Sequence, residues 1–299
     1  MIYKGEQAIK DSLNVLKIEN HRKRESYVHK LLDYYNGSNT KYYIENRFDL
    51  DAFREVPPYE ANITKKFINK MSRIYTVGAD RNVNEKYDTL SVLKDAKMKH
   101  IERMTRLVGT IATRIMFVDG EMPHFDYQPI YYFHPFFGSD PFKPIAISYP
   151  LMHYTEDASN SDACQYIHWN AESYIIFDES GKVLEEAEHG YGTLPFVFTH
   201  REHQSDSFYV EGANDICNAN EHINITMTEL QLGLRFQMFG QPVVSGADLG
   251  NNQRFGSDVI LELPEGANYN ILSPAGDIEK VIENVKFQME LVAQNNHLS

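Results

Sequence analysis

The side chains of this sequence best suited to chemistry are its 12 histidines and one pair of acids. His200 and His203 lie three residues apart, but on an expected loop and outside an HExxH helix that would aim both imidazoles at one metal ion. Asp119 and Asp126 could act as paired carboxylates, yet Asp119 belongs to an Asp-Gly turn and nothing places the two acids around a cleft. We therefore predict neither a metal site nor an acid–base pair.

Motifs that cradle phosphates or activate a nucleophile are absent from the sequence. It contains no G-x-S-x-G elbow, Walker A loop or G-x-G-x-x-G fingerprint, and Cys164 and Cys217 stand in no ligand spacing. We expect a protein that is not an enzyme and uses no cofactor or metal. The alternative is a hydrolase or carbohydrate-active enzyme built on the aromatic, histidine-rich middle region, with His134, His168 and His200 clustered in a deep pocket.

The charge balance limits the possible partners. The chain has 299 residues, with 29 Lys and Arg against 42 Asp and Glu, and a formal net charge of −13. This balance argues against a protein that wraps nucleic acid by neutralising phosphates, although a surface that repels a polyanion fits it. There is no signal-peptide pattern and no apolar window long enough to span a membrane. We expect a soluble protein made in a reducing compartment, with no membrane partner.

Helical periodicity dominates the first third of the chain. Apolar spacing predicts helices over residues 6–36, 62–75 and 89–108. Gly37 and Gly78 follow the first two and are expected to end them, because glycine readily adopts the left-handed conformation found after helix ends.

The helix expected over 62–75 carries the densest basic surface of the chain. Its outer positions are Lys65, Lys66, Lys70 and Arg73. We interpret this surface as a solvated face or a subunit contact with acidic neighbours, and direct DNA binding is the less favoured alternative.

Strand patterns follow up to about residue 210. Alternation near 115–118 leads into the Asp-Gly turn, and short strands are expected over 165–169 and 173–177. Residues 131–150 contain four prolines and are expected to form loops or an edge strand, because proline cannot donate to a central ladder. Helices followed by an antiparallel meander indicate an α+β fold rather than α/β.

The last third of the sequence has a different organisation. A long apolar-periodic helix is expected over 216–239, a short β-like insert over 243–272, and a second helix over 278–292. The apolar stripes of both helices are narrow and much of the remaining surface is polar. The two helices therefore form an expected arm that cannot bury its stripes alone.

The order of these elements and several local phrases resemble the portal proteins of tailed bacteriophages. Their subunits have an α+β wing, a long stem helix, a small β clip and a second stem helix. The phrases that carry the resemblance are LLDYYNGSN, NITKKFINKMSRIYTVGADR, GTLPFVFTH, EGANDICNANEHINITMTELQLGLRFQMFGQPVVSGAD and SPAGDIEKVIENVKFQMELVAQNN. The resemblance implies a wing over 1–210, a first stem helix over 211–241, a clip over 242–273 and a second stem helix over 274–299.

The resemblance also implies a function and its partners. A ring of subunits, usually a dodecamer in this family, would conduct double-stranded DNA at a capsid vertex of the virion after assembly in the host cytoplasm. Expected partners are the terminase large subunit, the major capsid or scaffold protein and a head–tail adaptor. A further alternative is that the chain is itself such an adaptor. Portals usually continue into a tunnel loop and a crown where this sequence ends, so the resemblance implies a truncated chain or a minimal portal.

Three sets of site residues follow from the resemblance. Acids expected to line the channel and repel phosphates are Glu229, Glu279, Glu283 and Glu290. Clip residues expected to dock the motor are Asp248, Asn251, Arg254, Asp258 and Glu262. Stripe residues expected to contact neighbouring subunits are Ile223, Met227, Leu230, Leu234, Ile278, Val281, Val285 and Val292.

Overall fold

The computed structural model has a mixed α+β fold, as the sequence predicts. It describes residues 5–48, 57–80, 82, 84, 85, 87, 90, 94–151, 165–204, 206–239, 241–245, 266, 268–272 and 278–298. The chain divides into two compact units: unit 1 comprises residues 1–38 and 62–217, and unit 2 comprises residues 39–61 and 218–299. Across the described ranges, no helix combines the length and apolarity needed to cross a lipid bilayer.

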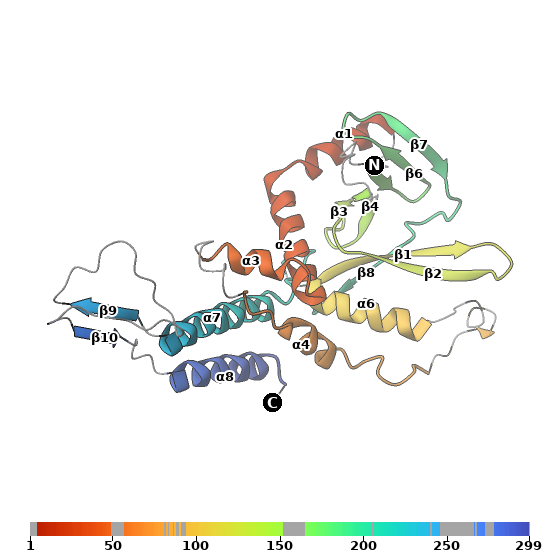
Figure 1. Cartoon of the computed structure of the whole chain (residues 1–299). Helices are drawn as coiled ribbons and strands as arrows, with labels where there is room; N and C mark the ends of the chain where they lie inside the picture. Colours follow the sequence, from red (N-terminus) through yellow and green to blue (C-terminus); the bar gives the residue numbers. More distant parts are fainter. Residues whose placement is uncertain are drawn as a thin grey trace. The chain divides into compact units, whose positions relative to one another are not determined.

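The helices of unit 1 are α1 (Gly5–Leu16), α2 (Glu19–Asn36), α4 (Ile63–Met71) and α6 (Lys94–Val108) (Figure 1). The single helix expected over 6–36 is wrong, because Ile18 is extended (φ −66°, ψ 140°) and separates α1 from α2. Gly37 ends α2 in the left-handed conformation as predicted, with φ 75°. The helix expected to reach residue 75 ends at Ser72 instead.

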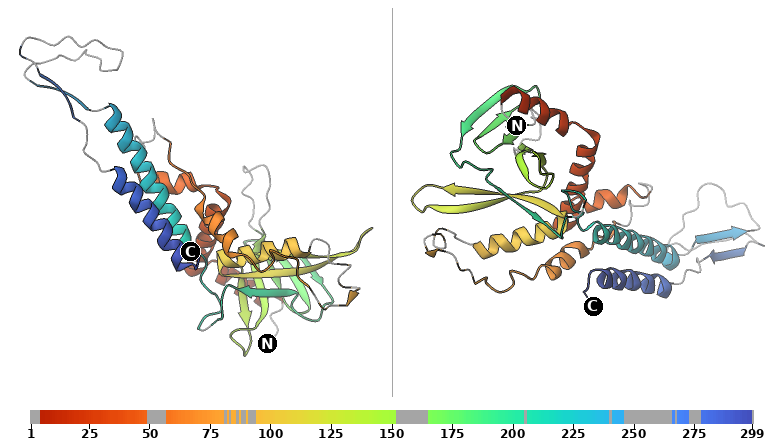
Figure 2. Two further views of the ribbon diagram at one scale, coloured as in Figure 1. Left: turned by 90° about the horizontal axis from the view of Figure 1, so that it is seen from below. Right: turned by 180° about the vertical axis from the view of Figure 1, so that it is seen from behind.

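Two antiparallel sheets complete unit 1. The larger follows the order β3 (His134–Phe137), β4 (Pro144–Leu151), β5 (Gln165–Trp169), β6 (Ser173–Phe177) and β7 (Val183–Glu188). The smaller follows β2 (His124–Ile130), β1 (Thr110–Val118) and β8 (Phe196–His200), so the hairpin predicted at Asp119-Gly120 is confirmed. Figure 2 shows both sheets from two further directions.

The proline-rich segment 131–150 was expected to lie in loops or at an edge, but β4 is an interior strand paired with both β3 and β5. The ladder survives because Pro144 and Pro150 stand at or next to the ends of the strand. Residues 146–149 between them are buried, and Ile147 and Tyr149 join Trp169 in a core cluster rich in aromatic residues. In β4 the burial of apolar side chains stabilises the sheet more than the missing N–H groups of the two prolines destabilise it.

A close crossing of two backbone segments leads into the long helix that starts at Asn214. Gly109 follows α6 with φ 91°, and Gly212 lies against the last turn of α6. The Ala213 N–H donates to the Leu107 carbonyl at 2.8 Å. A Cβ added at Gly212 would lie 2.2 Å from the Leu107 carbonyl oxygen. Only a residue without a side chain allows the two backbones to approach so closely.

Unit 2 has the helix–strand–helix order predicted for the arm. Its elements are α3 (Thr40–Glu45), most of α7 (Asn214–Phe239), β9 (Gln241–Ser245), β10 (Asn268–Leu272) and α8 (Ile278–Asn295). β9 and β10 form a two-stranded antiparallel ladder. α7 and α8 lie side by side in all three ribbon views (Figures 1 and 2). The division between the units falls after Cys217, and residues 39–61, expected in the wing, belong to unit 2.

Candidate functional site

The three histidines considered for catalysis lie in two different sheets of the structure. His168 is fully buried, and its Nδ1 lies 2.7 Å from the Ser148 hydroxyl and 3.2 Å from the Ser12 hydroxyl. His134 is paired with Ser148 on the other side of β4, whereas His200 lies in the smaller sheet and contacts the Thr110 hydroxyl at 3.0 Å. Burial lowers the pKa of His200. The contacts of His168 tie strands β4 and β5 to helix α1.

Two further observations bear on the predicted absence of a metal site and of paired acids. Within the part of the chain that the structure describes, no group of three or more His, Cys, Asp and Glu side chains is placed to hold a metal ion. Asp126, considered as a catalytic carboxylate, forms an ion pair with Lys97 of α6. The best-defined candidate for a functional surface is therefore the arm of unit 2.

α7 is buried along two different lines. Its apolar line matches the predicted stripe: Ile223 is buried, and Met227, Leu230 and Leu234 are half-buried. The second line was not predicted. Asn220, Asn224 and Thr228 recur every four residues on one side of the helix and are fully buried although polar.

The buried polar line of α7 holds the extended segment 57–61 of the same unit. The Asn224 side chain accepts from the Ala61 N–H at 2.9 Å and donates to the Ala61 carbonyl at 3.2 Å. The Thr228 hydroxyl accepts from the Tyr59 N–H at 2.9 Å. An amide side chain offers both a donor and an acceptor. Asn224 therefore forms hydrogen bonds with both the N–H and the carbonyl of Ala61, as a neighbouring strand would. Arg47 adds an ion pair to the nearly buried Glu221 at 3.1 Å.

α8 has one shielded side and a largely exposed remainder. Val285 is buried, and the other predicted stripe residues of this helix, Ile278, Val281 and Val292, are half-buried. The predicted stripe is thus already shielded within a single chain. Whether these residues also contact neighbouring subunits stays a prediction.

The acids of α8 fall on the side opposite its shielded line. Glu279, Glu283 and Glu290 are all exposed. With 3.6 residues per turn they lie within about 40° of one another in projection, and roughly 150° from the shielded line. Glu229 of α7 is exposed as well. α8 therefore presents a mainly acidic face to its surroundings, with the exposed Lys286 at its edge, about 20° from Glu279 in projection.

Exposed apolar residues flank this acidic face on both sides. The apolar period of the sequence predicts Ile282 and Met289 to be buried, which is wrong, and it does not include Phe287 and Leu291. Phe287 and Leu291 on one side are 62% and 44% exposed, and Ile282 and Met289 on the other are 40% and 36% exposed. The sequence signal for Phe287 and Leu291 is a second set of apolar residues outside the predicted stripe. Clustered exposed apolar side chains on one helix are typical of an interaction surface.

The predicted motor-docking residues cannot be placed. Asp248, Asn251, Arg254, Asp258 and Glu262 all lie outside the described residues. In the sequence they lie between β9 and β10, which pair with Gln241 opposite Leu272 and Ser245 opposite Asn268.

Comparisons with known proteins complement this description. No protein-family model matches the sequence, and no curated protein matches it. A similar chain among solved structures comes from one described as "Neck of empty GTA particle computed with C6 symmetry". The match has 10% sequence identity and a TM-score of 0.44, and covers 86% of this chain and 68% of that one.

Proposed function

We propose that this chain is a subunit of a ring-shaped viral portal, which forms the channel for double-stranded DNA at a capsid vertex. The observation that carries the proposal is the outer surface of α8, where an acidic face opposite the shielded side is flanked by exposed apolar residues. In a ring of such arms, the apolar flanks would be covered by neighbouring copies. The acidic face would then be left toward the channel.

The electrostatics of the acidic face suit a conduit for DNA. A duplex carries one negative charge per about 1.7 Å of its axis, and a basic lining would bind it with counterion release. Acidic side chains at Glu279, Glu283 and Glu290 instead repel the phosphates, so the duplex can slide without being held. The chain carries no chemistry of its own under this proposal. ATP hydrolysis belongs to the terminase, which docks through the segment between β9 and β10.

The resemblance of the local phrases to portal proteins supports the finer parts of the proposal. These are a homo-oligomeric ring, in this family usually a dodecamer, contacts with terminase, capsid or scaffold protein and head–tail adaptor, and a location in the virion. The helix–strand–helix order of the arm, which the resemblance implies, is present in the structure.

Oligomeric state tests the proposal directly. Mass photometry and electron microscopy of the purified chain are expected to give rings with a central channel, and the reconstruction should place the Glu279, Glu283 and Glu290 side chains on the channel wall. The double variant Phe287→Ser/Leu291→Ser is expected to shift the particles toward monomers, because it removes apolar area that a neighbour would cover.

A matched control isolates the apolar contribution. Lys286→Ser/Gln294→Ser introduces the same two residues on the same helix, next to the acidic face, and should leave the rings intact. A wild-type chain that stays strictly monomeric and compact would contradict the proposed function. If the Phe287→Ser/Leu291→Ser variant still forms rings, the contact of these two residues with a neighbouring copy is wrong, but the proposed function is not contradicted.

A further inference from the structure

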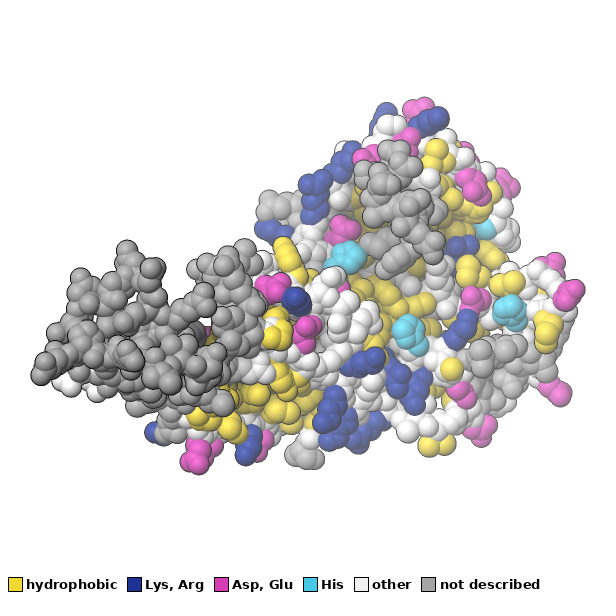
Figure 3. All heavy atoms as spheres, in the orientation of Figure 1, with side chains coloured by type: hydrophobic (Ala, Val, Ile, Leu, Met, Phe, Trp, Pro, Cys, Tyr) yellow, Lys and Arg dark blue, Asp and Glu magenta, His cyan; other side chains and the backbone are white. Residues whose placement is uncertain are grey.

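A second charged surface lies on unit 1, at helix α4. Residues 62–79 contain Lys65, Lys66, Lys70 and Arg73 and no acidic residue, in a chain whose formal net charge is −13. All four basic side chains are exposed, whereas Phe67 on the other side of α4 is buried. Figure 3 shows Lys and Arg side chains gathered over the region of α4.

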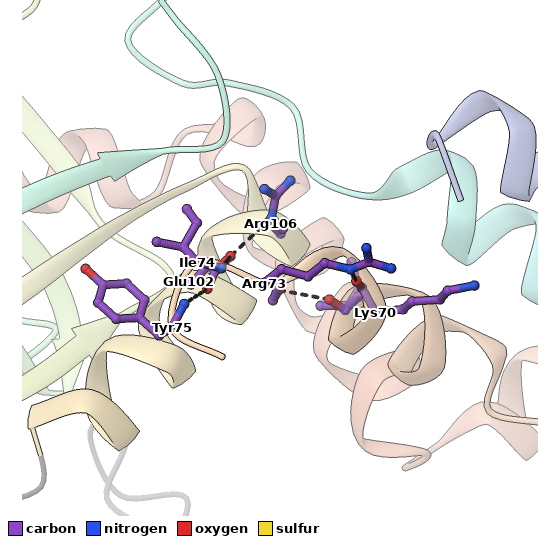
Figure 4. Close-up of polar contacts among 8 residues, drawn as sticks. Lys70, Arg73, Ile74, Tyr75, Glu102 and Arg106 are labelled. Carbon is purple, nitrogen blue, oxygen red and sulfur yellow. Dashed lines mark hydrogen bonds and ion pairs between the residues drawn. The ribbon is translucent and has the colours of Figure 1, made fainter. Parts of the chain in front are cut away.

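Nearby carboxylates do not neutralise this surface. None of the four basic side chains forms an ion pair with another described residue. Glu102 of α6, which contacts the turn after α4, is 8% exposed and is engaged internally. It accepts from the Ile74 N–H at 3.2 Å and the Tyr75 N–H at 3.4 Å, and lies 3.7 Å from the Arg106 Nε (Figure 4). Its charge therefore fixes the turn after α4 instead of pairing with the lysines.

The turn fixed by Glu102 positions the last residue of the basic surface. The Arg73 Nε donates to the Lys70 carbonyl at 2.8 Å, which holds the guanidinium beside the end of α4 (Figure 4). Helices α2, α4 and α6 pack against one another beneath this surface. Arg103 of α6 adds positive charge, and the pKa of His100 is lowered by burial and then by that charge. The basic side chains thus stand on a rigid support.

The length of the surface suits an extended ligand. Two cavities of about 250 and 260 Å³ among the described residues are lined by other elements, including α2, β2 and β4, and by no residue of α4 or α6. α4 has nine residues, which corresponds to about 13 Å of helix. At 3.4 Å per nucleotide along one DNA strand, that length matches about four nucleotides.

The net negative charge of the chain does not prevent binding of a polyanion here. Exposed charges separated by more than the Debye length, about 8 Å at physiological salt, are largely screened from one another. The field close to α4 is therefore set by its own lysines and arginine. Three of the four side chains are lysines, a residue type that is depleted in protein–protein interfaces, so the composition fits a phosphate backbone better than an acidic protein.

We propose that Lys65, Lys66, Lys70 and Arg73 form a binding surface for the phosphate backbone of double-stranded DNA, without reading its sequence. From the sequence alone, DNA binding by this helix was the less favoured alternative, and it is now the one we propose. The surface consists of unit 1 residues only and needs no ring. The choice of DNA among polyphosphates rests on the proposed function.

Fluorescence anisotropy with a labelled duplex of about 30 base pairs tests the proposal. With four phosphate contacts, the slope of log affinity against log salt should be about −3 to −4, and affinity should fall roughly 100-fold between 50 and 200 mM salt. The variant Lys66→Glu/Lys70→Glu/Arg73→Glu should bind DNA at least about tenfold more weakly at 50 mM salt. Its affinity should also depend less on salt, with a slope between about −1 and zero.

The matched control reverses the same amount of charge elsewhere on unit 1. Lys10, Lys143 and Lys182 are exposed, and their triple replacement by glutamate should retain wild-type affinity and slope. Equal losses in both triple variants would overturn the proposal, because net charge alone would then explain binding. The proposal would also be overturned if the α4 variant kept its DNA affinity but changed its oligomeric state in mass photometry. The basic face would then contact another copy of the chain and not DNA. If every variant still forms rings, the proposed portal function is not contradicted, whichever result the DNA-binding measurements give.

Discussion

Gly212→Ala is expected to destabilise unit 1 by at least about 3 kcal/mol and to leave little soluble, folded protein. The added Cβ would stand 2.2 Å from the Leu107 carbonyl oxygen and 2.8 Å from the Val108 carbonyl carbon. Both are backbone atoms, so no side chain can move aside. The segment cannot retreat easily, because the Ala213 N–H and the Arg201 guanidinium hold it through hydrogen bonds of 2.8 and 3.0 Å.

Chemical denaturation followed by circular dichroism measures this effect, and Gly233→Ala is its control. Gly233 lies within α7, and a Cβ built there meets no atom within 4 Å. The same substitution should therefore stabilise the helix by up to about 1 kcal/mol, because alanine has the higher helix propensity. If the two variants have similar free energies of unfolding, the close backbone crossing does not constrain the fold.

Asn224→Ala is expected to weaken unit 2 by about 2 to 3 kcal/mol. The substitution removes both hydrogen bonds between the Asn224 side chain and the Ala61 backbone, and leaves that N–H and that carbonyl without their partner. Hydrogen exchange at the Ala61 amide gives a local measurement. A loss of about 2 kcal/mol corresponds to roughly 30-fold faster exchange if the segment opens locally.

Asn218→Ala is the matched control for this substitution. Asn218 lies on the same helix, is only half-buried, and its side chain forms no hydrogen bond with the described residues. Its replacement should change stability by less than about 0.5 kcal/mol and leave Ala61 exchange unchanged. An Asn224 variant that exchanges at the wild-type rate would show that the amide is not what holds residues 57–61.

The fold was predictable where local pattern and tertiary packing agree. The strands expected over 165–169 and 173–177 have those bounds in the structure, because a short turn separates two alternating runs. The helix expected over 62–75 was too long because Ile74 continues the apolar period but is 69% exposed. The prolines of β4 predicted an edge strand, and only its pairing with both β3 and β5 shows that the strand is interior.

The candidate site was harder to predict because it depends on which helix faces are covered. The apolar period located the arm and its stripes, but asparagine and threonine on α7 gave no apolar signal. Only the four-residue spacing of Asn220, Asn224 and Thr228 could have indicated a buried face. On α8 the apolar period separated the shielded Val285 from the exposed Phe287, but it also included Ile282 and Met289, which are exposed.

The pairing of residues 57–61 with α7 also affects how the protein is made. Ala61 and Asn224 are 163 residues apart in the chain. During synthesis at about 5 to 20 residues per second, the earlier segment must wait roughly ten to thirty seconds for its partner. Unit 2 therefore has a high contact order, and closing it is expected to be a late step of folding. An arm expressed from residue 211 onward would lack that segment and expose the buried asparagines to water.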